Sequence, residues 1–379
     1  MGIWPRPVEG VALNADADAK FWRGKRVLLT GHSGCKGSWL TLWLHRLGAQ
    51  VTGVSLPPMT TPNLFTDAKI DAICDSHFCD IRDNIALEEL IYAAQPEIVF
   101  HLAAQPLVRA SYREPRMTFE TNVMGTAHVL EAVCDLSSVR VAVMITTDKV
   151  YRDMQSPEPY REDDSLGGYD PYSASKAASE MVIESYRKSF LSAQGVAVAS
   201  ARAGNVIGGG DWSEDRLIPD AVRAWQARET LEVRRPQAVR PWQHVLEPLS
   251  GYLTLAQQLW ERPALAGAYN FGPSVNDAVA VRDVVELARA AYGEGEVQYG
   301  QGSEGPHEAA WLALDAGRAE TVLGVSPRLT LVQAIQRTMA WYRAQADGGN
   351  ARELCEADIA DFEARVSRLV ADAGRIRYG

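Results

Sequence analysis

The stretch RVLLTGHSGCKGSWLTLWLHRL, residues 26–47, decides the fold class of this chain. Its first five residues form an apolar run with the length and composition of a buried parallel strand. A glycine-rich turn, GHSGCKG, follows directly, and residues 38–47 then have a helix-length apolar pattern. A strand that enters a glycine turn and continues as a helix predicts the first βα unit of a sheet that binds ligands at its edge.

The rest of the N-terminal half repeats this alternation. Further apolar runs, separated from one another by helix-length patterns, lie at residues 51–55, 98–102, 141–146 and 196–201. Repeated βαβ units predict an α/β fold with a Rossmann-like, doubly wound parallel sheet. Beyond residue 204 the chain is richer in glycine and proline, and helices are expected near residues 216–228, 246–261, 281–292 and 330–344. Residues 1–24 have no regular pattern, and we expect them to be irregular.

The length of 379 residues favours two lobes over two independent domains. We expect a Rossmann-like dinucleotide-binding domain at 20–203, to which 243–275 returns. A smaller C-terminal α/β substrate lobe is expected at 204–242 and 276–345. Residues 346–379 are charged and rich in alanine, which predicts a peripheral helix or a loose tail.

Composition and charge exclude several classes of function. The net charge is −10 and no lysine- or arginine-rich tract is present, so nucleic acid is not an expected partner. The histidines form no HExxH pair, and the N-terminus has neither a leader pattern nor an 18-residue apolar stretch. We expect a cytoplasmic protein with no metal, export signal or membrane span. Reduced thiols are expected because neither CxxC nor zinc-ribbon spacing relates the cysteines Cys35, Cys74, Cys79, Cys134 and Cys355.

The glycine turn is the expected cradle for a dinucleotide. Glycines permit a tight turn and let a diphosphate approach the backbone N–H groups at the start of the next helix. The spacing GxxGxxG, rather than GxGxxG, indicates the short-chain dehydrogenase variant. The residues expected at the cofactor are Gly31, Ser33, Gly34, Cys35, Lys36 and Gly37 in the turn, and Ser55, Asp80, Ile81, Leu102, Ala103 and Ala104 near the ends of later strands.

Ser55 leaves the choice between NAD and NADP open. Many NAD sites have an acid at the end of the second strand, and many NADP sites have an arginine nearby. Ser55 is neither. Asp80, in the stretch DIRD, either faces the adenine or is an acidic residue at a helix N-terminus.

Two groups of residues are suited to chemistry. Tyr172 and Lys176 lie one helical turn apart, where an ammonium can lower the pKa of the phenol so that it accepts a proton from a sugar hydroxyl. Upstream, Thr147, Asp148 and Lys149 follow the run 141–146, at the edge where doubly wound sheets bind ligands. The plainer alternatives are an ordinary ion pair for Asp148 and Lys149 and a cap for Thr147.

From about Phe21 to Tyr342 the chain resembles the nucleotide-sugar 4,6-dehydratases of the extended short-chain dehydrogenase/reductase family, and among them those that act on CDP-glucose. The resemblance is carried by TGHSGCKGSWL (30–40), HLAAQPLVRASY (101–112), TTDKVY (146–151), YDPYSASK (169–176), RAGNVIGGGDW (202–212), DRLIPD (215–220) and RPWQHVLEPLSGYL (240–253). The glycine turn and YxxxK identify only the superfamily. Thr147 replaces the usual serine but keeps a hydroxyl, and Cys35 replaces a more common aromatic residue.

The resemblance implies NAD as cofactor and a redox-neutral conversion of CDP-D-glucose to CDP-4-keto-6-deoxy-D-glucose. The sugar is oxidised at C4, water is eliminated across C5 and C6, and hydride returns to C6. Tyr172 is then the base at C4 and Lys176 its electrostatic partner. Both also belong to the cofactor site, where Lys176 contacts the nicotinamide ribose. Thr147 is a hydrogen-bond partner of the C4 oxygen. Asp148 becomes the acid and Lys149 the base of the elimination, protonation states that are unusual at neutral pH.

On the substrate side, the resemblance places Asn205 and Arg216 at the nucleotide diphosphate. Arg240 is the expected second phosphate contact. Gln105 and Arg109 are expected either in the pocket or in the core, with nothing in the sequence to decide between them.

Three further residues are expected to support the site from outside it. Trp242 and His244 are expected to pack between the lobes rather than touch the sugar. Asn122 is expected to support the site through a backbone contact.

Two other functions stay open at this point. A nucleotide-sugar 4-epimerase uses the same cradle, tyrosine and lysine, but it needs no acid and base beside C5 and C6. A non-catalytic dinucleotide-binding protein is expected to lack the tyrosine or the lysine, and this chain has both. The resemblance also implies a homodimer, formed through 115–135 and 171–190, and a place in deoxysugar biosynthesis of the kind that supplies lipopolysaccharide O-antigen.

Overall fold

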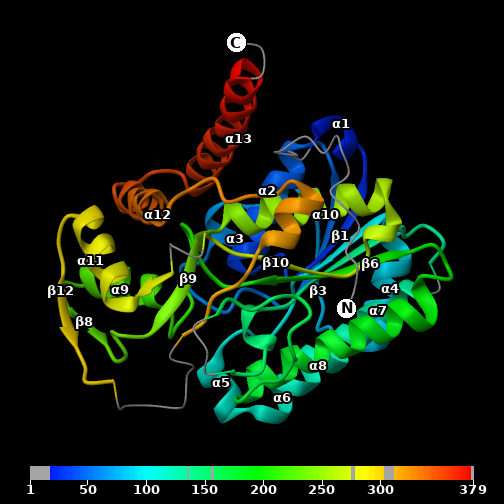
Figure 1. The fold of residues 1–379 in the computed structure, drawn as a ribbon, viewed down its shortest axis with the longest axis horizontal. Coiled ribbons are helices and arrows are strands. Elements are labelled where there is room, and N and C mark those ends of the chain that lie inside the picture. Colours follow the sequence, from blue (N-terminus) through cyan, green and yellow to red (C-terminus); the bar gives the residue numbers. More distant parts are fainter. Residues whose placement is uncertain (1–17, 135, 155–157, 275–277, 303–310, 377–379) are drawn as a thin grey trace.

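A seven-stranded parallel sheet forms the centre of the protein (Figure 1). The computed structural model describes residues 18–134, 136–154, 158–274, 278–302 and 311–376, with side chains as far as residue 365. The strands are β1 (Arg26–Thr30), β2 (Gln50–Ser55), β3 (Asp75–Phe78), β4 (Ile98–His101), β5 (Val141–Ile145), β6 (Ala197–Ala203), β7 (Asn205–Ile207), β8 (Thr230–Val233), β9 (Val239–His244), β10 (Ala268–Phe271), β11 (Ala278–Ala280) and β12 (Glu296–Tyr299). The helices are α1 (Ala19–Trp22), α2 (Cys35–Arg46), α3 (Leu64–Asp67), α4 (Asn84–Ala94), α5 (Val108–Arg113), α6 (Pro115–Phe119), α7 (Gly125–Cys134), α8 (Pro171–Tyr186), α9 (Leu217–Gln226), α10 (Leu246–Glu261), α11 (Val281–Tyr292), α12 (Leu331–Ala346) and α13 (Ala351–Ile376).

The order of the strands confirms the Rossmann-like, doubly wound fold. Across the sheet they run β10, β6, β5, β4, β1, β2, β3, and each neighbouring pair is parallel. The winding reverses between β1 and β4, which pair directly. In such a sheet ligands bind beyond the carboxyl ends of the strands at this switch point. The loops after β1, β4 and β5 therefore converge on one crevice.

Alternate residues of the strands face two separate cores, as the twofold repeat of a strand requires. Leu28 of β1 packs into a core with α4, α7 and α8, whereas its neighbour Leu29 packs into the other core with α2 and α10. Both side chains are fully buried. Helices on both faces explain why these strands are continuous apolar runs rather than alternating ones.

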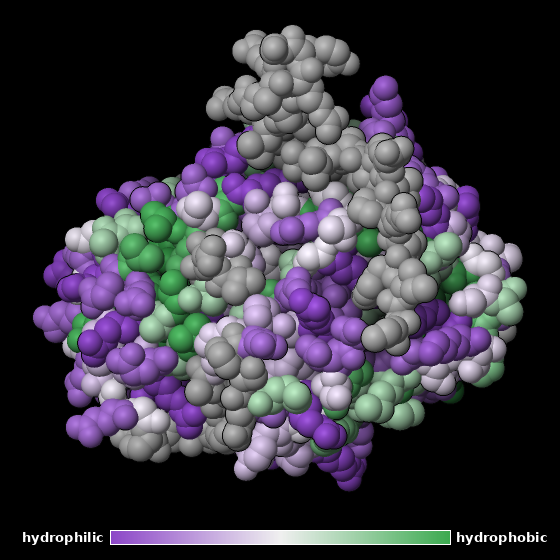
Figure 2. Space-filling view, in the orientation of Figure 1, coloured by the Kyte–Doolittle hydropathy of each residue, from purple (hydrophilic) through white to green (hydrophobic). Residues whose placement is uncertain are grey.

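The C-terminal half contributes to two layers. α10 packs on β5 and β6, and β10 extends the main sheet next to β6. β7, β9 and β11 form a separate sheet, and β8 pairs in parallel with β12. Figure 1 places β8, β12, α9 and α11 together, to one side of the main sheet. On this view hydrophilic residues cover most of the surface, with a smaller apolar area on the same side as α11 (Figure 2).

Two boundaries differ from the sequence prediction. The helix after β1 begins at Cys35 rather than Ser38, because Gly34 is its extended N-cap and the glycine turn itself supplies the first helical turn. Residues 19–22, expected to be irregular, form α1, whose N-cap Asp18 accepts a hydrogen bond from the backbone N–H of Lys20. The part of the predicted irregular segment before residue 18 lies outside the described residues.

The segment 346–379 contains a long helix, α13, which extends away from the body of the protein (Figure 1). The first turns of α13 pack against the body of the protein, because Cys355, Ile359 and Phe362 are fully buried in the hydrophobic core. Glu363 accepts hydrogen bonds from the indole of Trp43 and from Arg46 on α2. Of the two alternatives for this segment, the helix is the one observed. None of the helices in the described part of the chain is long and apolar enough to cross a membrane.

Candidate active site

The glycine turn has a shape that only glycine permits at two positions. Gly31 has a φ of +82°, and a Cβ there would lie 2.7 Å from the backbone nitrogen of Ala103. A Cβ on Gly37 would overlap the carbonyl group of Gly31. Gly34 is the N-cap of α2 and has no side-chain cap. The N–H groups at the start of α2 are therefore open to a diphosphate, which fits the bound anion that such a turn holds.

The other residues predicted at the cofactor surround this turn. Leu102 and Ala103 pass directly over it, because their N–H groups donate to the backbone oxygen and hydroxyl of Thr30 at 3.1 and 3.2 Å. Ala104 follows in the same loop. At the end of β2, the Ser55 hydroxyl accepts a hydrogen bond from the backbone N–H of Ser33 at 3.3 Å.

The end of β2 carries no charge in the folded protein. The Ser55 hydroxyl lies 3.0 Å from Nδ1 of the buried His32. Burial lowers the pKa of His32 to about 4, so its ring is neutral near pH 7. Neither an acid nor a cation therefore stands at this position.

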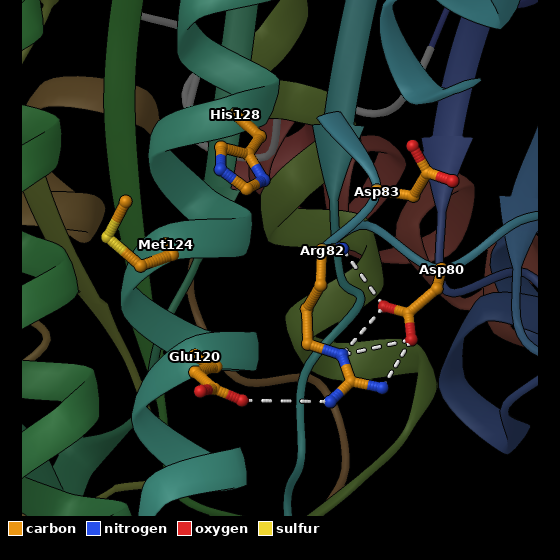
Figure 3. Close-up of a pocket in the computed structure, with 6 residues that line it drawn as sticks. All are labelled: Asp80, Arg82, Asp83, Glu120, Met124 and His128. Carbon is orange, nitrogen blue, oxygen red and sulfur yellow. Dashed lines mark hydrogen bonds and ion pairs between the residues drawn. The ribbon is translucent and has the colours of Figure 1, made fainter. Parts of the chain in front are cut away.

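Asp80 lies at the rim of a cavity of about 430 Å³, between the loop after β3 and the helix that leads into α7 (Figure 3). The guanidinium of Arg82 donates to both carboxylate oxygens of Asp80 and lowers the pKa of that carboxyl. On its other side Arg82 lies 3.9 Å from Glu120. The N-cap of α4 is Asp83, not Asp80. Asp80 is therefore not the helix N-terminal acid, and its neighbour Ile81 is buried.

Tyr172 and Lys176 lie on one face of α8, as their spacing predicts. Asp170 caps this helix through the backbone N–H of Ser173, and Pro171 occupies its first turn. Both side chains are buried, and the Lys176 ammonium donates to the backbone oxygen of Ile145 at 3.1 Å. The helix therefore delivers the phenol and the ammonium to the carboxyl end of β5.

The Thr147, Asp148 and Lys149 triplet meets Tyr172 at this point. The hydroxyl of Thr147 donates to Oδ1 of Asp148 at 3.0 Å and also hydrogen-bonds Tyr172. Lys149 donates to the same Oδ1 at 3.1 Å and to the side-chain oxygen of Asn205 at 3.3 Å. Asp148 is fully buried, and its Oδ2 has no hydrogen-bond partner among the described residues. The structure thus brings a phenol and a carboxyl group to one hydroxyl, and an amine to that carboxyl group.

Burial shifts the protonation of three side chains here. It raises the pKa of Tyr172 to about 12, against the lowering effect of the Thr147 hydrogen bond. It lowers the pKa of Lys176 to about 8, against the raising effect of Glu180. Lys36 of the glycine turn also has its pKa lowered to about 8, by burial and then by the nearby Arg216. The phenol is therefore protonated in the ligand-free protein, while two lysines are near the balance between charged and neutral.

Asn122 holds the loop after β4 against α8. Its side-chain oxygen accepts from the N–H of Gln105 at 2.8 Å, and its amide donates to the Gln105 carbonyl at 3.1 Å and to the Ser175 hydroxyl at 2.9 Å. This is the backbone contact that we expected of Asn122. The Gln105 side chain itself is engaged inside the protein, with Thr118 and with the N–H of Leu107. That geometry favours the core alternative for Gln105.

The arginines predicted on the substrate side differ in their surroundings. Arg216 lies close enough to Tyr172 to lower its pKa electrostatically, and its Nε is 3.9 Å from Asp211. Arg240 is buried and donates to the carbonyl oxygen of Val239. Arg109 forms an ion pair with Asp215 at 3.2 Å.

Trp242 and His244 are both buried. The ring of His244 meets Trp39 of α2 edge to face, with centroids 6.2 Å apart. This places His244 in the packing between α2 and the strand β9, as expected.

Sequence reasoning missed a buried network behind the site. Glu180 of α8 accepts from Arg202 at 3.0 and 2.8 Å, from Thr146 at 2.5 Å and from Ser200 at 2.7 Å. Arg202 also donates to the hydroxyl of Tyr151 at 2.9 Å. Glu180 is four residues beyond Lys176 on the same helix, a spacing that would have indicated that both face the sheet.

The fold and these residues define a class. A doubly wound parallel sheet, a GxxGxxG cradle at its switch point, and a tyrosine and lysine one helical turn apart are the features of the extended short-chain dehydrogenases/reductases. More narrowly, the chain belongs to the GDP-mannose 4,6 dehydratase family, whose model matches residues 28–338.

The proteins to which this chain is similar include other nucleotide-sugar 4,6-dehydratases. CDP-glucose 4,6-dehydratase of Salmonella typhimurium is 44% identical over 93% of this chain and 99% of the relative. dTDP-glucose 4,6-dehydratase of Xanthomonas campestris is 28% identical over 83% of this chain and 92% of the relative. Among solved structures, dTDP-glucose 4,6-dehydratase of Bacillus anthracis in complex with NAD has a TM-score of 0.71 and 22% identity, covering 86% of this chain and 99% of its own. UDP-glucose 4-epimerase of Thermotoga maritima has a TM-score of 0.72 and 21% identity, over 84% of this chain and 99% of its own. The two structures support the fold alone.

Proposed function

We propose that this protein is a CDP-glucose 4,6-dehydratase, which converts CDP-D-glucose to CDP-4-keto-6-deoxy-D-glucose with NAD as cofactor. The observation that carries the proposal is the meeting of Asp148 and Lys149 with Tyr172 through the hydroxyl of Thr147. An acid and a base beside the tyrosine are needed for elimination of water and not for epimerisation. The identity of 44% to a CDP-glucose 4,6-dehydratase supports the same choice.

The residues of the glycine turn would hold the diphosphate of NAD at the start of α2, and Ser55 and Asp80 lie where its adenosine half is expected. NAD supplies the acceptor and donor of hydride. Because His32 is neutral and Ser55 uncharged, nothing at the end of β2 is arranged to pair with a 2′-phosphate. The uncharged end of β2 therefore favours NAD over NADP.

Tyr172 removes the proton of the C4 hydroxyl. A phenol with a pKa of about 12 is a poor base near neutral pH, so cations must stabilise the phenolate as it forms. Arg216 lowers the pKa of Tyr172 already in the ligand-free protein, and Lys176 lies one turn away on the same helix. Thr147 hydrogen-bonds the phenol and is placed to do the same for the C4 oxygen.

Transfer of a single proton between Asp148 and Lys149 supplies both the acid and the base that the elimination needs. Movement of a proton from the Lys149 ammonium to the Asp148 carboxylate, along their 3.1 Å hydrogen bond, produces a carboxylic acid and a neutral amine together. The amine then removes the proton at C5, and the acid protonates the departing C6 hydroxyl. No proton needs to enter from solvent before the elimination.

The direct test is incubation of the purified protein with CDP-glucose and NAD, followed by the absorbance of the product at alkaline pH. A 4-keto-6-deoxy sugar absorbs under these conditions, whereas a 4-epimer does not. Parallel reactions with dTDP-, GDP- and UDP-hexoses, and with NADP in place of NAD, identify the base and the cofactor. A clear epimer without the alkaline signal would exclude a dehydratase and leave the epimerase.

We also propose that the protein is a homodimer that works in the cytoplasm. α6 and α7 both pack against α8. On these helices and directly beside them, four large apolar side chains are exposed to solvent, namely Phe119, Met124, Met181 and Phe190. Exposed apolar residues on adjacent helices are the mark of an association surface. Sedimentation of the full chain tests this, and a monomer at micromolar concentration contradicts it. The product would enter deoxysugar biosynthesis, of which lipopolysaccharide O-antigen is the expected destination.

For the division of the chain we propose the bounds that the sequence predicts. We propose a dinucleotide-binding part at 20–203 with 243–275, a substrate lobe at 204–242 with 276–345, and a C-terminal segment from 346. The places of β10 and α10 on the main sheet support the return of 243–275 to the first part.

A further inference from the structure

One carboxylate holds two arginines that come from different parts of the chain. Arg109 of α5 and Arg234, directly after β8, both approach Oδ1 of Asp215, with N···O distances of 3.2 and 3.6 Å. Arg109, Asp215 and Arg234 have side chains that are 27, 28 and 39% exposed, so solvent and small anions can reach them. In Figure 1, α5 lies beneath the main sheet and β8 lies in the part to its side, so the cluster joins the two.

The cluster adjoins the candidate active site. Arg216, the residue after Asp215, lies close enough to Tyr172 and Lys36 to lower the pKa of each. The Nε atoms of Arg109 and Arg216 are buried and have no hydrogen-bond partner among the described residues. A guanidinium can only donate, so each of these buried N–H groups lacks an acceptor in the ligand-free protein.

The local charge favours an anion as well. Arg109, Arg216 and Arg234 face two carboxylates, Asp211 and Asp215, which leaves one positive charge in excess in a protein whose net charge is −10. A further acid nearby, Asp220, is already paired with Arg223 on the same helix.

We propose that Asp215 is an internal counter-ion that keeps Arg109 and Arg234 together for the diphosphate of the nucleotide sugar, and that the diphosphate displaces the Asp215 carboxylate when it binds. The proposal rests on the proposed function, because the nucleotide sugar supplies the diphosphate. Two guanidinium groups that converge on one carboxylate oxygen can bind a phosphate oxygen in the same way. A diphosphate offers more charge and more acceptor oxygens than one carboxylate, so the exchange is favourable.

This arrangement has a consequence that an ordinary ion pair would not have. The carboxylate competes with the substrate, so its removal strengthens binding of the anion although it deletes a contact of the folded protein. A purely structural bridge between the two parts predicts the opposite, because its loss weakens both stability and binding.

The variant Asp215→Asn separates the two outcomes. Asp215 has a φ of +57°, in the left-handed region, which asparagine adopts as readily as aspartate. The substitution therefore removes the charge and keeps the backbone. Calorimetric titration with CDP and with inorganic pyrophosphate compares the wild type, D215N and Arg234→Met. Glu286→Gln is the matched control, because Glu286 also holds two partners, Arg289 and Tyr299, but on the surface of α11.

We expect D215N to bind both probes about three- to tenfold more tightly, the amount that one or two partly exposed ion pairs contribute. R234M should bind both at least about tenfold more weakly, and E286Q should match the wild type. Unchanged or weaker binding by D215N overturns the proposal, and a loss of thermal stability alongside weaker binding would make the cluster a structural bridge. Turnover of CDP-glucose is scored separately on the wild type. Tighter pyrophosphate binding without turnover keeps the anion site and rejects the dehydratase, whereas turnover without tighter binding does the reverse.

Discussion

Replacement of Arg202 by methionine tests how the buried network supports the site. Arg202 and Glu180 have side chains that are each 4% exposed, and two hydrogen bonds of 3.0 and 2.8 Å join them. Methionine fills much of the space of the arginine stem but leaves the Glu180 carboxylate in the interior with only the hydroxyls of Thr146 and Ser200 as donors. We therefore expect a large loss of stability from one exchange far from any surface.

The size of the loss follows from the burial. Removing one partner of a buried ion pair costs about 3–5 kcal/mol, because the remaining charge is left without compensation. An unfolding entropy of about 2.1 cal/mol/K per residue amounts to about 0.8 kcal/mol/K for 379 residues. The melting temperature of Arg202→Met should therefore fall by about 4–6 °C.

Calorimetric melting of the wild type, R202M, Glu180→Met and the double variant completes the test. The double variant leaves neither member of the Arg202–Glu180 ion pair without its partner, so its loss should be smaller than the sum of the two single losses by at least about 1.5 kcal/mol. Additive losses would refute the reasoning, since they would mean that the two side chains contribute independently. The same would follow if R202M melted within about 1 °C of the wild type.

Further predictions concern the chemistry. Tyr172→Phe should lower kcat by about 10²–10⁴-fold with little change in melting temperature, as measured by the alkaline absorbance of the product. Asp148→Asn should block elimination but not oxidation at C4, so the absorbance of reduced cofactor should appear without product; an inert variant would contradict the assigned role. The pKa of Lys176, about 8, lies below its usual 10.5, so the cation is present below that pH and is lost above it. The value of kcat/KM should therefore fall as the pH rises through about 8, and Lys36→Met should keep this alkaline limb if Lys176 is responsible. Gly37→Ala should abolish binding of NAD, measured by fluorescence titration, because a Cβ there overlaps the backbone of the same turn.

The sequence was informative about the main sheet because its central strands are buried on both faces. β1 and β5 are continuous apolar runs that cannot be confused with surface segments. β9 was missed because its sequence, VRPWQH, contains arginine, proline, glutamine and histidine, although five of its six residues are buried. Tertiary packing, rather than an apolar pattern, keeps this strand in place. β8 does alternate between buried and exposed residues, but four residues are too few for the pattern to stand out.

The candidate site could be predicted as far as local spacing allows. Tyr172 and Lys176 are related by one helical turn, and Asp148 follows a recognisable strand, so their meeting at one edge of the sheet follows from the topology. The partners of Asp215, Arg109 and Arg234, lie 106 and 19 residues away in the sequence. No rule of local spacing predicts that these side chains meet. The same holds for Glu180 and Arg202, which belong to a helix and a strand brought together only by the sheet.

The charge balance of the site connects these features to the reaction. Arg216 acts electrostatically on Tyr172, and Lys176 lies one helical turn from it. Burial makes Lys176 and its neighbour Lys36 costly to keep charged. A nucleotide sugar brings its diphosphate to this side of the site, and negative charge beside a buried lysine favours the ammonium. Binding of the substrate should therefore restore the cations that stabilise the Tyr172 phenolate, at the moment when the C4 hydroxyl is in reach. The cationic environment that binds the phosphates and the one that activates the base are in this sense a single electrostatic arrangement. For that reason free CDP, which carries the phosphates but no hexose, should itself raise the pH at which Lys176 loses its proton.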